Sequence, residues 1–207
     1  MVFFLMPCPE DTSEIMRQVI QGLLVALAAW CGLGHAVTGP NVIVEYHNTL
    51  LDHYFLAILP NEIGTIDGGH AGPGWVRTGE TFLTEDYGLW TAGPQVLRFY
   101  GSYDIGPNSH FYTNIPAEYQ MLRQIEAETP PGVRKWHYET AGFPAGLVGP
   151  TGCAVPQVYK VPVYRLYNDG MARGIDVNHR YTKRQEVVAE MVAKGWVLEG
   201  PVFCVIQ

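Results

Sequence analysis

The feature that most constrains the fold of this chain is an internal repeat that covers most of its length. Three consecutive segments carry the same motifs in the same order: two short aromatic stretches, a helical stretch, and a stretch from a tryptophan to a phenylalanine. The last segment reads VPVYRLYN, DVNHRYT, KRQEVVAEMVAKG and WVLEGPVFCV, and the middle one QVLRFYG, PNSHFYT, IPAEYQMLRQIEAE and KWHYETAGF. The first segment, which is the most divergent, reads VIVEYHN, LLDHYFL, PNEIGTIDGG and GWVRTGETF. Units this short cannot bury a hydrophobic face alone, so we expect all three to pack around a shared core.

Alignment of the three segments places the same residue types at matching positions. The interval from the tryptophan to the phenylalanine is seven residues in each segment. Arg98 is aligned with Arg165, where the first segment has Glu45. The other aligned sets are His53, His110 and His179; Glu62, Glu118 and Glu186; Trp75, Trp136 and Trp196; and Phe82, Phe143 and Phe203.

Local patterns predict the elements of each unit. Aromatic and β-branched stretches separated by Asn, Gly, Asp and Pro are typical of half-buried strands joined by turns. In the last unit a capping-box-like Thr182-x-x-Gln185 begins a helix that Gly195 ends. The stretch from tryptophan to phenylalanine returns as a strand. The sequence therefore predicts an α+β fold, a single domain of three β-β-α-β repeats (about 41–94, 95–160 and 161–207) with approximate three-fold pseudo-symmetry around a β-rich core.

The N-terminal part of the chain is predicted to be removed. Residues 1–36 read as an upstream segment followed by a secretory signal peptide, with Met16 as the start of translation. An apolar run at 19–33 follows Arg17 and precedes small residues that suit signal peptidase. The mature domain is then 37–207, and no further apolar stretch reaches the roughly 20 residues of a transmembrane helix. We expect an exported protein, periplasmic or extracellular, without stable membrane insertion after cleavage of the leader.

Two cysteines, Cys153 and Cys204, remain once the leader is removed. In an oxidising compartment such a pair is expected to form a disulfide. It would close a loop of about 50 residues and stabilise the domain by roughly 3–4 kcal/mol.

The units have the form YR-F/L-YN … NHxYT … E … GWxxEGxxF. In this form they resemble a repeat of unknown function that is found in exported bacterial and fungal proteins, often attached to secreted hydrolases and peptidases. The resemblance covers nearly all of the predicted mature chain and is looser in the first unit, where Glu45, His47 and Thr78 depart from the pattern. It implies the repeat architecture and export, but no particular activity.

Composition and motifs exclude several classes of function. With 13 Lys+Arg against 20 Asp+Glu and a net charge of -7, the chain has no positive excess to bind nucleic acid. The predicted mature chain has two serines, Ser102 and Ser109, and neither lies in a G-x-S-x-G motif, which argues against a serine hydrolase. The motifs H-E-x-x-H, C-x-x-C, the EF-hand loop and the Walker loop are missing from the sequence. We expect no phosphoryl transfer, no nicotinamide chemistry and no organic cofactor.

The candidate catalytic residues are the aligned histidines, His53, His110 and His179. Imidazole is the side chain whose pKa best suits a general base near neutral pH. Three neutral imidazoles brought together by the pseudo-symmetry would bind zinc and leave one position for water. In the alternative interpretation each histidine is structural and hydrogen-bonds within its own unit.

Acidic and amide side chains close to these histidines form a second set of candidates. The oxygen ligands Asp104, Asp176 and Asn178 would suit calcium, which polarises a carbonyl while a histidine takes a proton from water. Calcium and zinc are therefore the two metals that the sequence suggests.

The aromatic residues support a different class of function. The tryptophans and the tyrosines 100, 112, 167 and 181 have the amphipathic rings that stack on sugars. For the tryptophans, core packing is the stronger interpretation, because residues needed in every repeat usually hold the fold. Two further residues, Arg98 and Arg165, are predicted to pair with Glu139 and Glu199.

Two hypotheses follow. The first is an exported small hydrolase that acts on an ester, a lactone or a related acyl compound with calcium or zinc. The second is a non-catalytic module that binds a glycan or cell-wall polymer. The partner is accordingly a small-molecule substrate or a glycan, and the first hypothesis is favoured because here the repeat forms the whole predicted mature chain.

Overall fold

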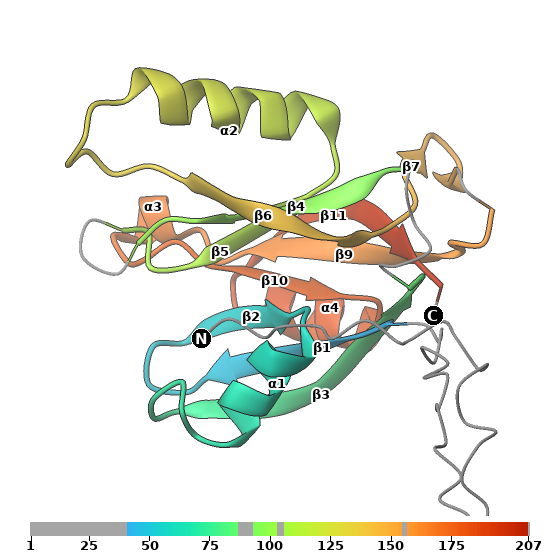
Figure 1. Cartoon of the computed structure of the whole chain (residues 1–207), viewed down its shortest axis with the longest axis horizontal. Coiled ribbons are helices and arrows are strands. Elements are labelled where there is room, and N and C mark those ends of the chain that lie inside the picture. The colour runs from blue at the N-terminus through green and yellow to red at the C-terminus, as the bar shows by residue number, and fades with distance from the viewer. Residues whose placement is uncertain (1–40, 87–92, 103–105, 155–156, 207) are drawn as a thin grey trace, which may run out of the picture. The chain divides into compact units, whose positions relative to one another are not determined.

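Three three-stranded antiparallel sheets make up the fold (Figure 1). The structure is a computed structural model, and it describes residues 41–86, 93–102, 106–154 and 157–206. The predicted upstream segment and signal peptide, residues 1–36, lie outside the described residues.

In each sheet the first strand along the chain lies between the other two. The first sheet, in the order β2-β1-β3, contains β1 (Asn41–Asn48), β2 (His53–Ala57) and β3 (Trp75–Thr84). The second sheet, in the order β5-β4-β6, contains β4 (Gln95–Tyr100), β5 (His110–Thr113) and β6 (His137–Pro144). The third sheet, in the order β10-β9-β11, contains β9 (Val161–Tyr167), β10 (His179–Thr182) and β11 (Val197–Val205).

A helix joins the second and third strands of every sheet. These helices are α1 (Pro60–Asp67), α2 (Pro116–Glu128) and α4 (Gln185–Ala193). Each sheet together with its helix therefore has the order β-β-α-β, in a mixed α and β architecture. The additions to this plan are a short helix α3 (Gly170–Arg173) and a hairpin of β7 (Val148–Gly149) and β8 (Gly152–Cys153).

A buried phenylalanine occupies the equivalent position in each of the three sheets. Each lies opposite an aliphatic residue of the first strand in its sheet, in the pairs Phe82 with Ile43, Phe143 with Val96, and Phe203 with Val163. All six side chains are at most 1% exposed. Because the side-chain direction alternates along a strand, these pairs fix which residues of each sheet face the core. Two residues further along the first strands lie Glu45, Arg98 and Arg165.

One hydrophobic core contains residues from all three sheets. Two tyrosine hydroxyls form hydrogen bonds between sheets within this core. The hydroxyl of Tyr112 donates to the carbonyl oxygen of Leu56 and accepts from its amide, at 3.1 Å each. The hydroxyl of Tyr181 makes the same two bonds to the backbone of Tyr112, at 3.0 and 2.8 Å. These bonds satisfy backbone groups that the core would otherwise leave without partners, and they tie the third sheet to the second and the second to the first.

The three helices differ in how closely they pack. α4 buries Val187, Val188 and Met191 against Leu166 and Trp196. By contrast α2 buries only Leu122, and α1 has no buried residue. The first two helices therefore cover their sheets loosely.

The predicted capping box of α4 does not form. The helix begins one residue after Arg184, whose side chain makes no cap hydrogen bond. The hydroxyl of Thr182 instead accepts the amide of Arg184 at 3.0 Å and donates to Glu80 of β3 at 2.6 Å. The hydroxyl therefore accepts an amide just before the helix rather than one in its first turn, and its proton links the third sheet to the first.

The predicted disulfide between Cys153 and Cys204 is confirmed. It joins β8 to β11, and Gly146 and Cys204 exchange backbone hydrogen bonds beside it. Among the helices in the described part of the chain, none combines the length and the apolar character that crossing a membrane requires.

Candidate functional site

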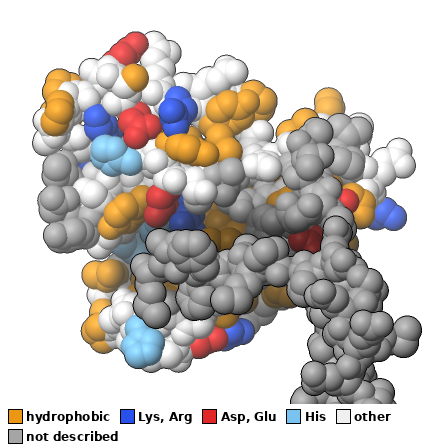
Figure 2. All heavy atoms as spheres, viewed as in Figure 1, with side chains coloured by type: hydrophobic (Ala, Val, Ile, Leu, Met, Phe, Trp, Pro, Cys, Tyr) orange, Lys and Arg blue, Asp and Glu red, His pale blue; other side chains and the backbone are white. Residues whose placement is uncertain are grey.

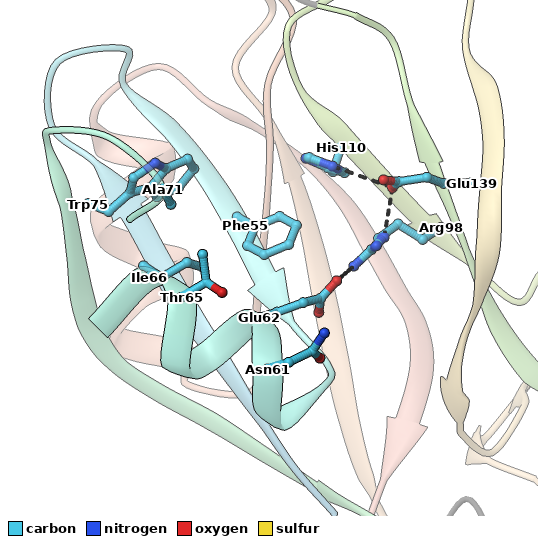
Figure 3. A pocket seen from close by; sticks show the side chains of 10 residues that line it. All are labelled: Phe55, Asn61, Glu62, Thr65, Ile66, Ala71, Trp75, Arg98, His110 and Glu139. Carbon is cyan, nitrogen blue, oxygen red and sulfur yellow. Dashed lines mark hydrogen bonds and ion pairs between the residues drawn. The ribbon is translucent and has the colours of Figure 1, made fainter. Parts of the chain in front are cut away.

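A hollow of about 340 Å³ opens between the first and second sheets (Figure 3). We call it the first pocket. The first sheet and α1 contribute Phe55, Glu62 and Trp75, and the second sheet contributes Arg98, His110 and Glu139. This volume lies at the lower end of the range for small-molecule sites, and the loose cover by α1 leaves it open.

One wall of the first pocket is a connected chain of charged groups. The Arg98 guanidinium is held between two carboxylates, with Nη1 2.8 Å from Glu62 Oε1 and Nε 2.7 Å from Glu139 Oε2. The second Glu62 oxygen accepts the amides of Ile58 and Leu59 at 2.8 and 3.1 Å, just before α1 begins. The bonds from Arg98 and from the two amides hold the Glu62 carboxylate in place before a ligand arrives.

His110 extends the chain of polar groups. Its Nε2 lies 3.5 Å from Glu139 Oε2, and its ring stacks on Tyr100 with centroids 4.7 Å apart. Burial lowers the pKa of His110 although Glu139 acts in the opposite direction, so the imidazole is neutral near pH 7. Burial alone would raise the pKa of Glu139, but its contacts with His110 and Arg98 outweigh this and lower it. The wall therefore contains two carboxylates and one guanidinium and carries a net negative charge.

The opposite wall is aromatic. Phe55 and Trp75 meet edge to face with centroids 6.1 Å apart, and both are partly exposed. The Arg98 guanidinium lies 5.5 Å from the centre of the Phe55 ring, and His110 meets the same ring at 4.7 Å. The pocket therefore offers two partly exposed aromatic rings close to hydrogen-bond acceptors.

The structure separates the three predicted catalytic histidines into two places. His53 and His110 both line a smaller hollow of about 190 Å³ beside the first pocket, together with Glu139. His179 lies between the second and third sheets, where its Nε2 is 3.9 Å from Glu199. In the described residues no group of three or more His, Cys, Asp or Glu side chains is arranged to hold a metal ion.

Strand register shows that His53 is not equivalent to the other two histidines, which corrects the alignment. His110 lies opposite Tyr100 and His179 opposite Tyr167, each two residues beyond the central arginine. The matching position in the first sheet is Tyr54, opposite His47, and His53 lies one residue earlier. A shift of one residue in a strand turns a side chain to the other face of the sheet.

The two predicted metal ligands that the structure describes, Asp176 and Asn178, do not line the first pocket. Asp104 falls outside the described residues. Asp176 forms an ion pair with Arg134 at 2.7 Å, and its other oxygen lies 3.9 Å from His53. Asn178 is fully buried and its amide donates to the Asp52 carbonyl at 2.6 Å, so it links the third sheet to the first.

Sequence reasoning found part of the polar wall and missed the rest. The predicted pair of Arg98 with Glu139 is confirmed at 2.7 Å, and so is the pair of Arg165 with Glu199 at 2.6 Å. The role of Glu62 was missed, because it comes from the preceding repeat. The sequence contained one signal for it. The aligned glutamates Glu62 and Glu118 are each followed, in the next unit, by an arginine, Arg98 and Arg165.

A family model described as Domain of unknown function (DUF5648) matches residues 46–206. The chain belongs to this DUF5648 family. The DUF5648 region includes every residue named above in the first pocket, so the pocket lies within the family's domain. Comparison with curated proteins and with solved structures gave no match.

Proposed function

We propose that this chain is an exported, non-catalytic protein that binds a neutral glycan in the first pocket. We further propose that its three β-β-α-β units are related by approximate three-fold pseudo-symmetry, which places pockets at the junctions between units. The observation that carries the proposal is the pairing of an aromatic wall with a fixed wall of hydrogen-bonding groups across one open hollow.

The two walls suit the two faces of a sugar ring. The C–H face of a sugar packs on aromatic rings such as Trp75 and Phe55, which are partly exposed. Ring hydroxyls donate well to ionised carboxylates, and Glu62 and Glu139 are held in place by Arg98. Rigid groups lose little conformational entropy when a ligand binds, which favours affinity.

The charge of the pocket indicates which sugars it accepts. Two carboxylates against one guanidinium and a neutral imidazole give a net negative wall, which repels uronic and other acidic sugars. On the face shown in Figure 2, the described apolar and charged side chains are interspersed. Because the wall of the first pocket is net negative, neutral glycans are the favoured ligands.

Export is supported by the disulfide. Cys153 and Cys204 are bonded, and such bonds persist in oxidising compartments outside the cytosol. A glycan on a cell surface or in a cell wall is a ligand that such a protein would meet.

Titration calorimetry with three neutral trisaccharides, cellotriose, mannotriose and triacetylchitotriose, tests the proposal. We expect at least one to bind, trigalacturonic acid to bind poorly, and Trp75→Ala to remove binding in the first pocket without unfolding the protein. The matched control is Val76→Ala, on the same strand but with its side chain 49% exposed. Absence of binding by all three sugars, or full binding by Trp75→Ala, would reject the proposal.

A hydrolase is the second candidate, and the hollow shared by His53, His110 and Glu139 favours it. His110 would act as the general base for a water molecule attacking an ester or lactone, with calcium or zinc as a metal partner. An ester and lactone screen with and without a chelator tests this. If this candidate holds, His110→Gln lowers the rate by about 10²–10⁴ while His179→Gln does not; a metal-assisted reaction also stops with the chelator.

A further inference from the structure

A second hollow, of about 350 Å³, lies between the second and third sheets. We call it the second pocket. The second sheet and α2 contribute Phe111, Glu118 and Trp136 to it, and the third sheet contributes Arg165, His179 and Glu199. Strand register places Phe111, Arg165 and His179 at the positions that Phe55, Arg98 and His110 occupy in the first pocket. Glu118 lies in the first turn of α2 as Glu62 does in that of α1, and Trp136 directly precedes β6.

The polar wall of the second pocket is built in the same way. Arg165 binds Glu118 through two nitrogens, at 2.9 and 2.7 Å, and binds Glu199 through Nε at 2.6 Å. Its guanidinium lies 4.5 Å from the centre of the Phe111 ring, as Arg98 lies over Phe55. Again two carboxylates face one guanidinium, and the wall is fixed and net negative.

The surroundings of His179 and Trp136 also resemble those of His110 and Trp75 in the first pocket. The ring of His179 stacks on Tyr167 at 5.2 Å and meets Phe111 edge to face at 4.9 Å. This histidine is 6% exposed, and its Nδ1 has no hydrogen-bond partner among the described residues. Trp136 is partly exposed beside Phe111, as Trp75 is beside Phe55.

The third junction, between the third and first sheets, is filled instead. Glu45 stands where the other sheets have arginine, and Arg180 stands where they have Phe55 and Phe111. Arg180 binds Glu45 at 3.1 Å and lies 4.5 Å from the centre of the Tyr54 ring, so the pair occupies the junction. Trp196 is buried there by the closely packed α4.

We propose that the second pocket is a second, independent binding site for neutral glycans, so that one chain binds two sugar units and cross-links glycans. This rests on the proposed function of the first pocket. Two sites on one rigid domain raise the apparent affinity for a polymer far above that for one sugar, because the second contact becomes intramolecular.

The experiment is calorimetric titration of cellotriose, mannotriose and triacetylchitotriose into the wild type, Trp75→Ala, Trp136→Ala and the double variant. We expect two sugars per chain in the wild type, one in each single variant and none in the double variant. A wild-type stoichiometry of one that Trp75→Ala removes and Trp136→Ala leaves unchanged would overturn the second site while the first stands. No binding in the wild type would overturn both.

A blocking variant keeps the test independent of folding. Met171 lines the second pocket and is 82% exposed, so Met171→Trp fills the pocket without disturbing the core. Ile175→Trp, at a nearby residue that is 46% exposed, is the matched control. We expect Met171→Trp to halve the stoichiometry and Ile175→Trp to leave it at two; a stoichiometry of two in both variants contradicts the proposal.

Discussion

Glu45 and Arg180 form a buried ion pair in which the charges are reversed relative to the other two junctions. At the other two junctions the arginine comes from the later sheet and the glutamate from the helix of the preceding unit, in the pairs Arg98 with Glu62 and Arg165 with Glu118. Here the first sheet supplies Glu45, which is fully buried, and the third sheet supplies Arg180 at 3.1 Å. At this junction α4 packs closely, whereas each of the other two junctions contains a pocket.

The first prediction concerns this pair. Arg180→Met should destabilise the protein by about 3–5 kcal/mol, because it leaves Glu45 buried without its partner. The double variant Glu45→Leu with Arg180→Met should cost much less than the sum of the two single variants. Urea unfolding of the four proteins measures this coupling.

Lys194→Met, which breaks the exposed pair of Lys194 with Glu190, is the control and should change stability by less than about 1 kcal/mol. Additive effects of the two substitutions at the buried pair would show that it contributes no coupling.

The second prediction distinguishes Trp196 from Trp75 and Trp136 by their contribution to stability. From the sequence, all three are interpreted as core residues. Trp196 is 7% exposed and packs in a core cluster, so Trp196→Ala should cost about 3–5 kcal/mol. Trp75 and Trp136 are only partly buried, and their alanine variants should cost clearly less, while each loses glycan binding at its own pocket. Thermal and urea unfolding beside the binding titrations measures both effects, and equal destabilisation by all three variants would contradict this.

The order of strands and helices was predictable because each signal is local. Each unit contains its own aromatic stretches, turn residues and Trp-to-Phe interval. The pairing of Phe143 with Val96 follows from these local signals. The register of β2 was not predictable from residue identity. Asp52, with a positive φ of 53°, precedes that strand, and aligning His53 by type placed it one residue from its structural position.

The candidate site was harder to predict because it lies between units. Glu62 and Arg98 are 36 residues apart and meet only when two sheets pack together. Sequence patterns indicate which face of a strand is apolar, but not which neighbouring unit completes a polar pair. The within-unit pair of Arg98 with Glu139 was therefore found, and the contact with Glu62 was not.

The third prediction concerns acid sensitivity. Burial first, and then the charge of Arg165, lower the pKa of His179 from 6.5 to about 3. The folded state therefore binds this proton less readily than the unfolded state, so its contribution to stability is complete above about pH 6.5 and is lost as the pH falls toward 3. At pH 5 the loss should be roughly 2 kcal/mol. Unfolding of the wild type and His179→Gln between pH 4 and 8 measures it, and an equal slope in both proteins would refute it.

The fourth prediction concerns the disulfide in the chain expressed from Val37. Thiol titration of the denatured, unreduced protein should find neither Cys153 nor Cys204 free. Replacing both by alanine should cost about 3–4 kcal/mol, because the unfolded chain gains the freedom of a loop of about 50 residues. Reduction of the wild type should lower stability by a similar amount, and two free thiols before reduction would disprove the bond.

The last prediction concerns the tyrosine hydroxyls that tie the sheets together. Tyr181→Phe removes the hydroxyl bonded to both backbone groups of Tyr112, and Tyr112→Phe removes the one bonded to Leu56. Each should cost about 1–3 kcal/mol, because buried backbone groups are left without partners. The amide of Tyr112 should exchange with solvent faster in Tyr181→Phe, and the amide of Leu56 in Tyr112→Phe. Tyr164→Phe, at a partly buried position outside this network, is the control; if it costs as much as the other two, the hydroxyl bonds do not hold the sheets together.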